Sequence, residues 1–272
     1  MLNAIAVTLA IALVLAILGW LAGGAGWLMM LGGIGVFLNI PLYFLSGRMI
    51  LGRFRVSHLK KPEILAMVEK LALDAQVKPP RVFVMDAEQP NAFSVGRHKN
   101  KAAIVVTMGL LGLEREEIES VLAHEFGHIR NRDILPMTLG AALGMVFSWL
   151  ANRGYWSLFS VGERRQGNVL WMIPILILAP FGALFVRLSV DRSVEPRADY
   201  TSVMLRANPR AMASALRKAS AAAGRKPVTG TPVYASHLFL VNPYRRDWFT
   251  DLFNCHPPVE RRIEVLEGMR PG

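Results

Sequence analysis

Residues 124–128 read HEFGH, and this HExxH run decides how the rest of the chain is interpreted. On a helix, His124 and His128 lie one turn apart on the same face, so both imidazoles can reach one metal ion. Glu125 lies beside them and stays free to act as a base. With only 6 histidines in the chain, such a run would arise by chance in on the order of one chain in a hundred of this length. It predicts a catalytic metal helix over residues 114–131.

Two apolar runs at the N-terminus have the length of membrane spans. The chain is 53% hydrophobic with a mean hydropathy of +0.34, more than is usual for a soluble domain of this size. Residues 2–22 and 27–45 are nearly free of charge, and each has about the 20 residues that a spanning helix needs. We expect a helical hairpin. A cleaved signal peptide is the alternative, but no Lys or Arg precedes the first run and a second run follows at once.

Two further runs, residues 134–150 and 169–188, are apolar enough to span, which predicts a polytopic protein. The fourth contains Pro174 and Pro180, so two buried core helices are the alternative. The second run is followed by a basic cluster that predicts a cytoplasmic location for the segment containing HExxH: Arg48, Arg53, Arg55, Lys60 and Lys61. Three arginines between the third and fourth runs oppose this topology or indicate a hairpin that does not fully cross: Arg153, Arg164 and Arg165.

The net charge of +11 comes from scattered Lys and Arg residues, and the sequence has no basic stripe interleaved with aromatic residues. We therefore expect the lipid bilayer and its anionic headgroups as a partner, and no nucleic acid. A single cysteine, Cys255, excludes an internal disulfide and fits a reducing compartment.

Between the runs the chain is typical of a compact α+β unit. Residues 62–75 have helical apolar spacing, while residues 81–85 and 103–107 are short β-branched strands joined by a polar turn region that contains Gly96 and Asn100. We expect four segments: a transmembrane hairpin at 1–47, a catalytic part with the HExxH helix at 48–133, a second hydrophobic hairpin at 134–190, and a catalytic part with the third metal ligand at 191–272.

A catalytic zinc site usually has three protein ligands, so a third residue must join the two histidines. Glu195 and Asp199 lie one turn apart if residues 192–207 are helical. Glu195 would then bind the metal, and Asp199 would accept a hydrogen bond from a ligand histidine. A solvated helix face, with carboxylates that offset Arg192 and Arg197, is the alternative that spacing leaves open.

Four motifs occur in order: NAFSVGR at 91–97, AHEFGHIRNRD at 123–133, EPRADY at 195–200 and HPPVERRI at 256–263. Together with the apolar runs, they resemble the HtpX branch of the M48 metallopeptidases over essentially the whole chain. The resemblance implies a zincin-like domain and one zinc ion per chain, held by His124, His128 and Glu195, with Glu125 as the catalytic residue.

The resemblance further implies an endopeptidase of the bacterial cytoplasmic membrane that cuts misfolded or damaged membrane proteins in quality control, with autocleavage possible. Unfolded polypeptides are then the expected substrates, and a homo-oligomer or quality-control partners are further possibilities.

The sequence departs from the family beside Glu195. The family usually has an arginine before this glutamate and an aromatic residue after it, whereas Val194 and Pro196 stand here. Because proline interrupts helical hydrogen bonding, we expect the helix to begin or kink near Pro196.

Substrate binding and charge stabilisation have weaker candidates. His256 is our choice for stabilising the anionic intermediate, although a packing histidine is an equally good interpretation. The strand at 103–107, represented by Ala103, Ile104 and Val105, would pair with an extended substrate if its edge is open; a fully paired interior strand is the alternative. Asn91 would line the cleft or form a turn.

Two functions from other classes are alternatives to a protease. A structural, non-catalytic zinc site would have no use for the unligated Glu125. A transporter with an incidental HExxH would carry ionisable residues inside its spans, and these are almost absent from the first three.

Overall fold

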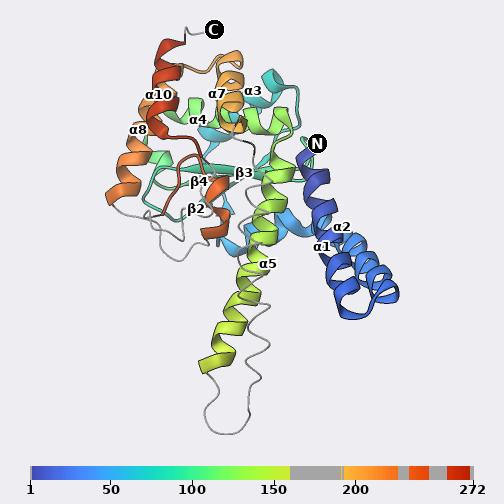
Figure 1. Cartoon of the computed structure of the whole chain (residues 1–272). Coiled ribbons are helices and arrows are strands. Elements are labelled where there is room, and N and C mark those ends of the chain that lie inside the picture. Colours follow the sequence, from blue (N-terminus) through green and yellow to red (C-terminus); the bar gives the residue numbers. More distant parts are fainter. Residues whose placement is uncertain (1, 160–190, 192, 226–232, 245–255, 270–272) are drawn as a thin grey trace.

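The computed structural model describes residues 2–159, 191, 193–225, 233–244 and 256–269 (Figure 1). It contains helices and one mixed sheet, as an α+β fold requires. The expected fourth apolar run, at 169–188, lies outside the described residues, as do Arg164, Arg165 and Cys255. The polytopic arrangement therefore stays a prediction.

The predicted N-terminal hairpin is confirmed: α1 (Leu2–Gly23) and α2 (Ala25–Arg53) are joined at Gly24, whose φ of +76° favours glycine. The two helices pack closely, since a Cβ added at Gly35 would lie 2.8 Å from the Cα of Ala12. Only 6% of the most apolar window of α2 is buried, although its mean hydropathy is 1.9. Among the described residues, α2 is the one helix that is long and apolar enough to cross a membrane.

The sheet has four strands in the order β1-β2-β4-β3: β1 (Ser57–His58), β2 (Arg81–Met85), β3 (Ala92–Gly96) and β4 (Ala102–Thr107). The predicted strands are β2 and β4, and they are parallel neighbours, with Phe83 opposite Val105. The region expected to be a polar turn contains a third long strand, β3, which is buried throughout and antiparallel to β4. The turn itself is confined to residues 97–101, because these are the polar residues of that stretch.

Strand β4 is an interior strand, so the expectation that its edge is open is wrong. It pairs with β2 on one side and with β3 on the other, and Ala103, Ile104 and Val105 are all buried. The two edge strands of the sheet are β1 and β3 instead.

Alternation along the strands separates two apolar cores. Ile104 and Val106 face helices α3 (Pro62–Ala75), α4 (Arg115–Asn131) and α8 (Pro209–Arg225) in one core. Ala103 and Val105 face the second core, which is completed by the end of α2, the first turns of α5 (Ile134–Phe159), and the short helix η3 (Val233–Leu238).

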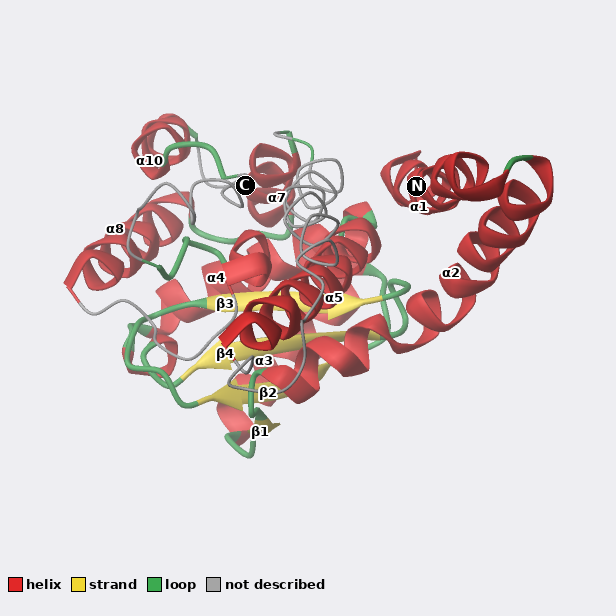
Figure 2. Ribbon diagram, turned by 60° about the horizontal axis from the view of Figure 1, so that its bottom comes forward, coloured by secondary structure: helices red, strands yellow, loops and turns green. Residues whose placement is uncertain are grey.

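The hairpin and α5 lie on the same side of the sheet and project away from α7 (Val194–Met204), α8 and α10 (Val259–Gly268) (Figure 1). Figure 2 shows the hairpin at the opposite end of the molecule from α8 and α10. Met137, Ala141 and Ala142 of α5 are buried on the sheet, so the start of this helix is a core element, as the alternative to a span allowed.

Candidate metal centre

Helix α4 places the two histidines of the HExxH run side by side in the protein interior. His124 and His128 are 0% and 3% exposed, and their Nε2 atoms lie 3.1 Å apart. The helix starts as its sequence predicts: the backbone N–H of Glu114 donates to the Glu117 carboxylate at 3.0 Å, which caps the first turn.

Gly127, inside the run, allows α7 to approach α4. A Cβ at this position would lie 2.8 Å from the backbone oxygen of Ala198, so any larger residue would push the two helices apart. The close contact carries Glu195 of α7 to the histidines. Its Oε2 lies 3.5 Å from His124 Nε2, and its Oε1 lies 3.7 Å from His128 Nε2.

Pro196 does not break the helix that carries Glu195. Helix α7 begins at Val194, so Pro196 is its third residue, where a backbone N–H has no acceptor within the helix. The helix therefore begins two residues before Pro196, and Glu195 lies in its first turn with the side chain buried.

His124, His128 and Glu195 form a group that could hold a metal ion, with donor atoms all within 4.8 Å of one another. A tetrahedral ion with bonds of about 2.1 Å would hold its donors about 3.4 Å apart, close to the observed separations. Two imidazole nitrogens and one carboxylate match the ligand set of catalytic zinc sites. The residues present therefore fit a zinc ion.

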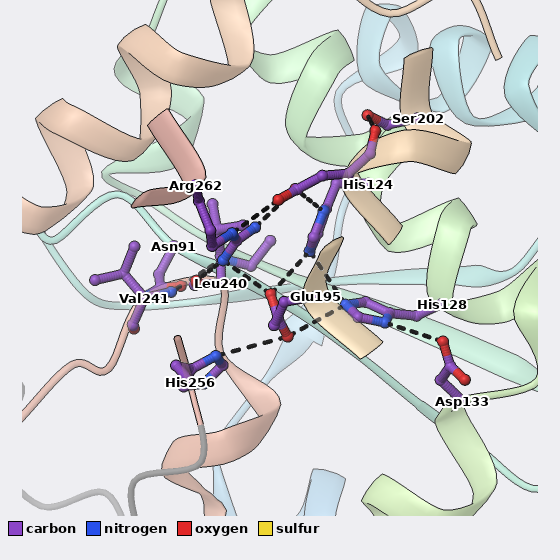
Figure 3. Close-up of polar contacts among 12 residues, drawn as sticks. Asn91, His124, His128, Asp133, Glu195, Ser202, Leu240, Val241, His256 and Arg262 are labelled. Carbon is purple, nitrogen blue, oxygen red and sulfur yellow. Dashed lines mark hydrogen bonds and ion pairs between the residues drawn. The ribbon is translucent and has the colours of Figure 1, made fainter. Parts of the chain in front are cut away.

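A carboxylate lies beside the outer nitrogen of each imidazole (Figure 3). Asp199 lies 2.8 Å from His124 Nδ1, and Asp133 faces His128 Nδ1 at 3.7 Å. Arg197 pairs with Asp133 at 3.2 Å. Because a carboxylate only accepts hydrogen bonds, Nδ1 of His124 carries the proton and its Nε2 presents a lone pair to the centre. The Nε2 atoms of the two histidines lie 3.1 Å apart, and the surrounding carboxylates favour a positive charge between them.

Arg262 of α10 connects both carboxylates of α7 and was missed from the sequence. Its Nη1 lies 2.8 Å from Glu195 Oε2, while its Nε and Nη2 donate to the two oxygens of Asp199 at 2.9 and 2.8 Å. Nη1 also donates to the backbone oxygen of Leu240 at 3.1 Å. The only sequence signal was its position inside the HPPVERRI motif, since spacing cannot relate residues 63 apart.

This arrangement makes the carboxylates anionic. Burial alone would raise the pKa of Asp199, but Arg262 and then His124 lower this pKa to about 2. Burial also opposes ionisation of Glu195, but Arg262 holds its pKa well below the usual range. Against the effect of burial, Asp199 raises the pKa of His124 to about 9. Without a metal, a proton on His124 thus supplies the positive charge that the centre requires.

Glu125 points to the same centre without an ion pair among the described residues. Burial raises the pKa of its carboxyl group, against the effect of the nearby histidines. The Ser94 hydroxyl hydrogen-bonds to the carboxylate, but Oε2 is buried with no hydrogen-bond partner in the described part of the chain. One oxygen of Glu125 is therefore available to accept a proton.

His256 is brought to the centre from the other end of the chain. Its Nδ1 lies 3.6 Å from Glu195 Oε1, and its Nε2 donates to the backbone oxygen of Ser236 at 3.2 Å. Burial lowers the pKa of this imidazole.

The side chain of Asn91 is buried and bonds to the backbone of the protein. Its amide nitrogen donates to the backbone oxygen of Val241 at 2.8 Å, and its amide oxygen accepts from the backbone N–H groups of Ala92 and Val241. The side chain fastens the segment at Val241 to the start of β3, and a place in the substrate cleft stays a prediction.

Comparison with known proteins identifies the family. The profile of Peptidase family M48 matches residues 58–270. A protease HtpX homolog from Pyrococcus furiosus is 39% identical over 256 residues, covering 92% of this chain and 89% of the relative. Another, from Syntrophotalea carbinolica, is 33% identical over 273 residues, covering 98% of each chain.

The fold is also that of a solved structure. The crystal structure of S. mikatae Ste24p superposes with a TM-score of 0.53 at 18% identity. The match covers 98% of this chain, which spans 65% of that longer one. With an HExxH helix, a carboxylate on α7 as the third candidate ligand and relatives over nearly its whole length, the chain is a metalloprotease that belongs to peptidase family M48.

Proposed function

We propose that this protein is a membrane-bound endopeptidase that uses one zinc ion, held by His124, His128 and Glu195, to hydrolyse peptide bonds in unfolded polypeptides. One observation carries the proposal: three buried donors converge within 4.8 Å, and Glu125 has an unpartnered carboxylate oxygen beside them. A bound zinc ion supplies a Lewis acid that polarises the peptide carbonyl and makes water acidic near neutral pH.

Glu125 then acts as the general base. Its Oε2 accepts the proton of the attacking water and passes it to the leaving amine, which needs a carboxylate with one oxygen free. The raised pKa of Glu125 favours the first of these transfers, because a base that is too weak accepts no proton at neutral pH. A structural zinc site would leave this buried carboxylate without a purpose.

Asp199 keeps His124 in the tautomer that presents Nε2, and Arg262 keeps Glu195 and Asp199 ionised. His256 is the candidate for the group that balances negative charge developing on the carbonyl oxygen. To do so it would exchange its bond with the Ser236 carbonyl for one with the substrate.

Substrate would pair with the free edge of β3 rather than with β4. In an antiparallel strand alternate residues bond to the neighbour, and the Ala92 oxygen and Gly96 nitrogen already face outward, to Leu240 and Thr138. Ser94, between them, therefore presents its N–H and C=O to the edge. Its side chain contacts Glu125, so a peptide paired here would cross the centre.

The centre is closed in this structure, because Ser94, Glu125 and Glu195 are each at most 3% exposed. Substrate entry therefore requires the covering chain to move. Such gating would restrict cleavage to extended, unfolded chains that can displace the cover. It would also suit a quality-control role on misfolded membrane proteins.

We place the catalytic domain on the cytoplasmic side of a cytoplasmic membrane, because the basic residues that follow α2 belong on that side. The segments 1–47 and 134–190 would be the membrane hairpins, and 48–133 and 191–272 would form the catalytic domain. Oligomerisation or association with quality-control partners would extend this role.

The test is cleavage of an unfolded model protein by the detergent-purified chain. Wild type with stoichiometric zinc should cut, whereas Glu125→Gln with the same zinc content and chelated wild type should not. If zinc binds at one ion per chain but wild type and Glu125→Gln are equally inert on varied substrates, the site is structural and the proposal fails.

A further inference from the structure

A cavity of about 440 Å³ lies between the end of α2 and the turn that joins β3 to β4. Helix α2 contributes Tyr43, Phe44 and Arg48 to its lining, and the sheet side contributes Arg81, Arg97 and Lys101. Helix and turn meet closely here, since a Cβ at Gly47 would lie 3.8 Å from the Cα of Gly96. The cavity is thus built by the junction between the membrane hairpin and the catalytic domain.

The lining carries four cationic side chains, and none of the described residues in it is acidic. Within the described part of the chain, none of these four forms an ion pair, in contrast to Arg197, Arg217 and Arg262. Because their positive charges converge on one cavity, an anion that is shared between them would be bound favourably there.

Arg97 is held in place by aromatic rings. Its guanidinium carbon lies 4.6 Å from the centre of the Phe44 ring and 5.8 Å from that of Tyr43. Stacking fixes the plane of the guanidinium, which leaves its N–H groups available for the oxygens of an anion.

The position of the cavity along α2 indicates the source of the anion. The exposed apolar side chains of this helix, including Phe37, Ile40 and Phe44, extend to Leu45, and Arg48 is the first charged residue after them. The helix rises about 6 Å from Phe44 to Arg48. Over this distance the surroundings of α2 would change from the acyl chains of the bilayer to its headgroups. Aromatic residues are also typical of this interface.

We propose that this cavity is a binding site for the phosphate headgroup of an anionic phospholipid. Its acyl chains would lie along the exposed apolar face of α2, and its phosphate would be shared by Arg48 and Arg97, with Arg81 and Lys101 at the sheet side. The lipid would couple the hairpin to the β3–β4 turn. This inference is independent of peptide hydrolysis, since binding can be measured without a protease substrate.

The test uses the full-length chain, in nanodiscs or detergent, with phosphatidylglycerol and phosphatidylcholine as probes. Retention of each lipid is measured by native mass spectrometry, and affinity by titration. Wild type should bind phosphatidylglycerol at least about tenfold more tightly than phosphatidylcholine, as expected for a charge-assisted contact. Arg48→Gln/Arg97→Gln should lose this preference.

A matched control, Lys60→Gln/Lys61→Gln, removes the same charge from exposed positions just beyond α2 that do not line the cavity. It should keep the preference. A second variant, Arg81→Gln/Lys101→Gln, changes only exposed side chains of the sheet side, should fold, and should also weaken phosphatidylglycerol binding.

Equal loss in the lysine control would mean that net charge alone attracts the lipid, which overturns the site. Competition by soluble glycerol 1-phosphate at the same concentration as the lipid would also overturn it, because the cavity would then be a site for free phosphate compounds.

Discussion

Replacing Arg262 with Gln tests the charge balance of the metal centre. The change removes one contact of 2.8 Å with Glu195 and two, of 2.9 and 2.8 Å, with Asp199. Both carboxylates are buried, so they cannot recover these bonds from water. Removing one partner of a buried ion pair costs about 3–5 kcal/mol of stability.

For a chain of 272 residues that loss lowers the Tm by about 6–20 °C. The drop should be largest without metal and smaller with zinc, because the divalent ion supplies positive charge to the same carboxylates. Thermal unfolding in detergent, with chelator and with added zinc, measures both effects.

Arg261→Gln is the matched control, because Arg261 is the adjacent residue on α10 and is exposed. A Tm for Arg262→Gln equal to that of this control would refute the reasoning. So would a zinc-induced rise in Tm no larger than in wild type. In the double variant with Asp199→Asn, one uncompensated charge is gone, so the combined loss should be less than the sum by about 1–3 kcal/mol.

Three further predictions concern the surroundings of the centre. Asp199→Asn should weaken zinc binding by about 10–100-fold, measured by competition with a chelating dye, because the His124 tautomer is no longer fixed; unchanged affinity would contradict this. Gly127→Ala should cost about 1–3 kcal/mol of stability and weaken zinc binding, since the new Cβ would lie 2.8 Å from the Ala198 oxygen. The control Gly112→Ala should do neither, because a Cβ at Gly112 would have no atom within 4 Å. Burial lowers the pKa of His237 from 6.5 to about 4, so folding favours the neutral imidazole. The contribution of His237 to the free energy of unfolding is therefore complete above pH 6.5 and is lost as the pH falls toward 4. Between pH 6.5 and 5.5 the metal-free wild type should lose up to about 1.4 kcal/mol more stability than His237→Gln, and parallel pH profiles would rule out this role.

The elements with a strong local pattern were predictable from the sequence. Helical spacing and a proline at the first position placed α3 at Pro62–Ala75, and the HExxH run placed α4 within one residue. The apolar runs predicted the hairpin of α1 and α2, because each run has the length and composition of one helix. Glu195 and Asp199 were candidates because residues four apart share a helix face.

Strand β3 was missed, because its five residues are followed by the polar stretch at 97–101 and were assigned to the same turn. The interior position of β4 was also beyond the sequence, since a buried apolar run looks the same whether one or both edges are paired. Only the register of β3 on β4 showed that the backbone N–H and C=O of Ser94 lie on the outer edge of β3.

The sequence by itself predicted the residues that could hold a metal ion, because HExxH spacing and helix periodicity act over a single turn. The tertiary structure decided how they work together. Arg262 reaches Asp199 across 63 residues, and Asn91 holds Val241 across 150. Contacts of this kind depend on how helices pack on the sheet. Packing is set by the shape of whole helix faces, such as the space beside Gly127 that the backbone of Ala198 fills. No local sequence pattern predicts which distant segment packs into such a space.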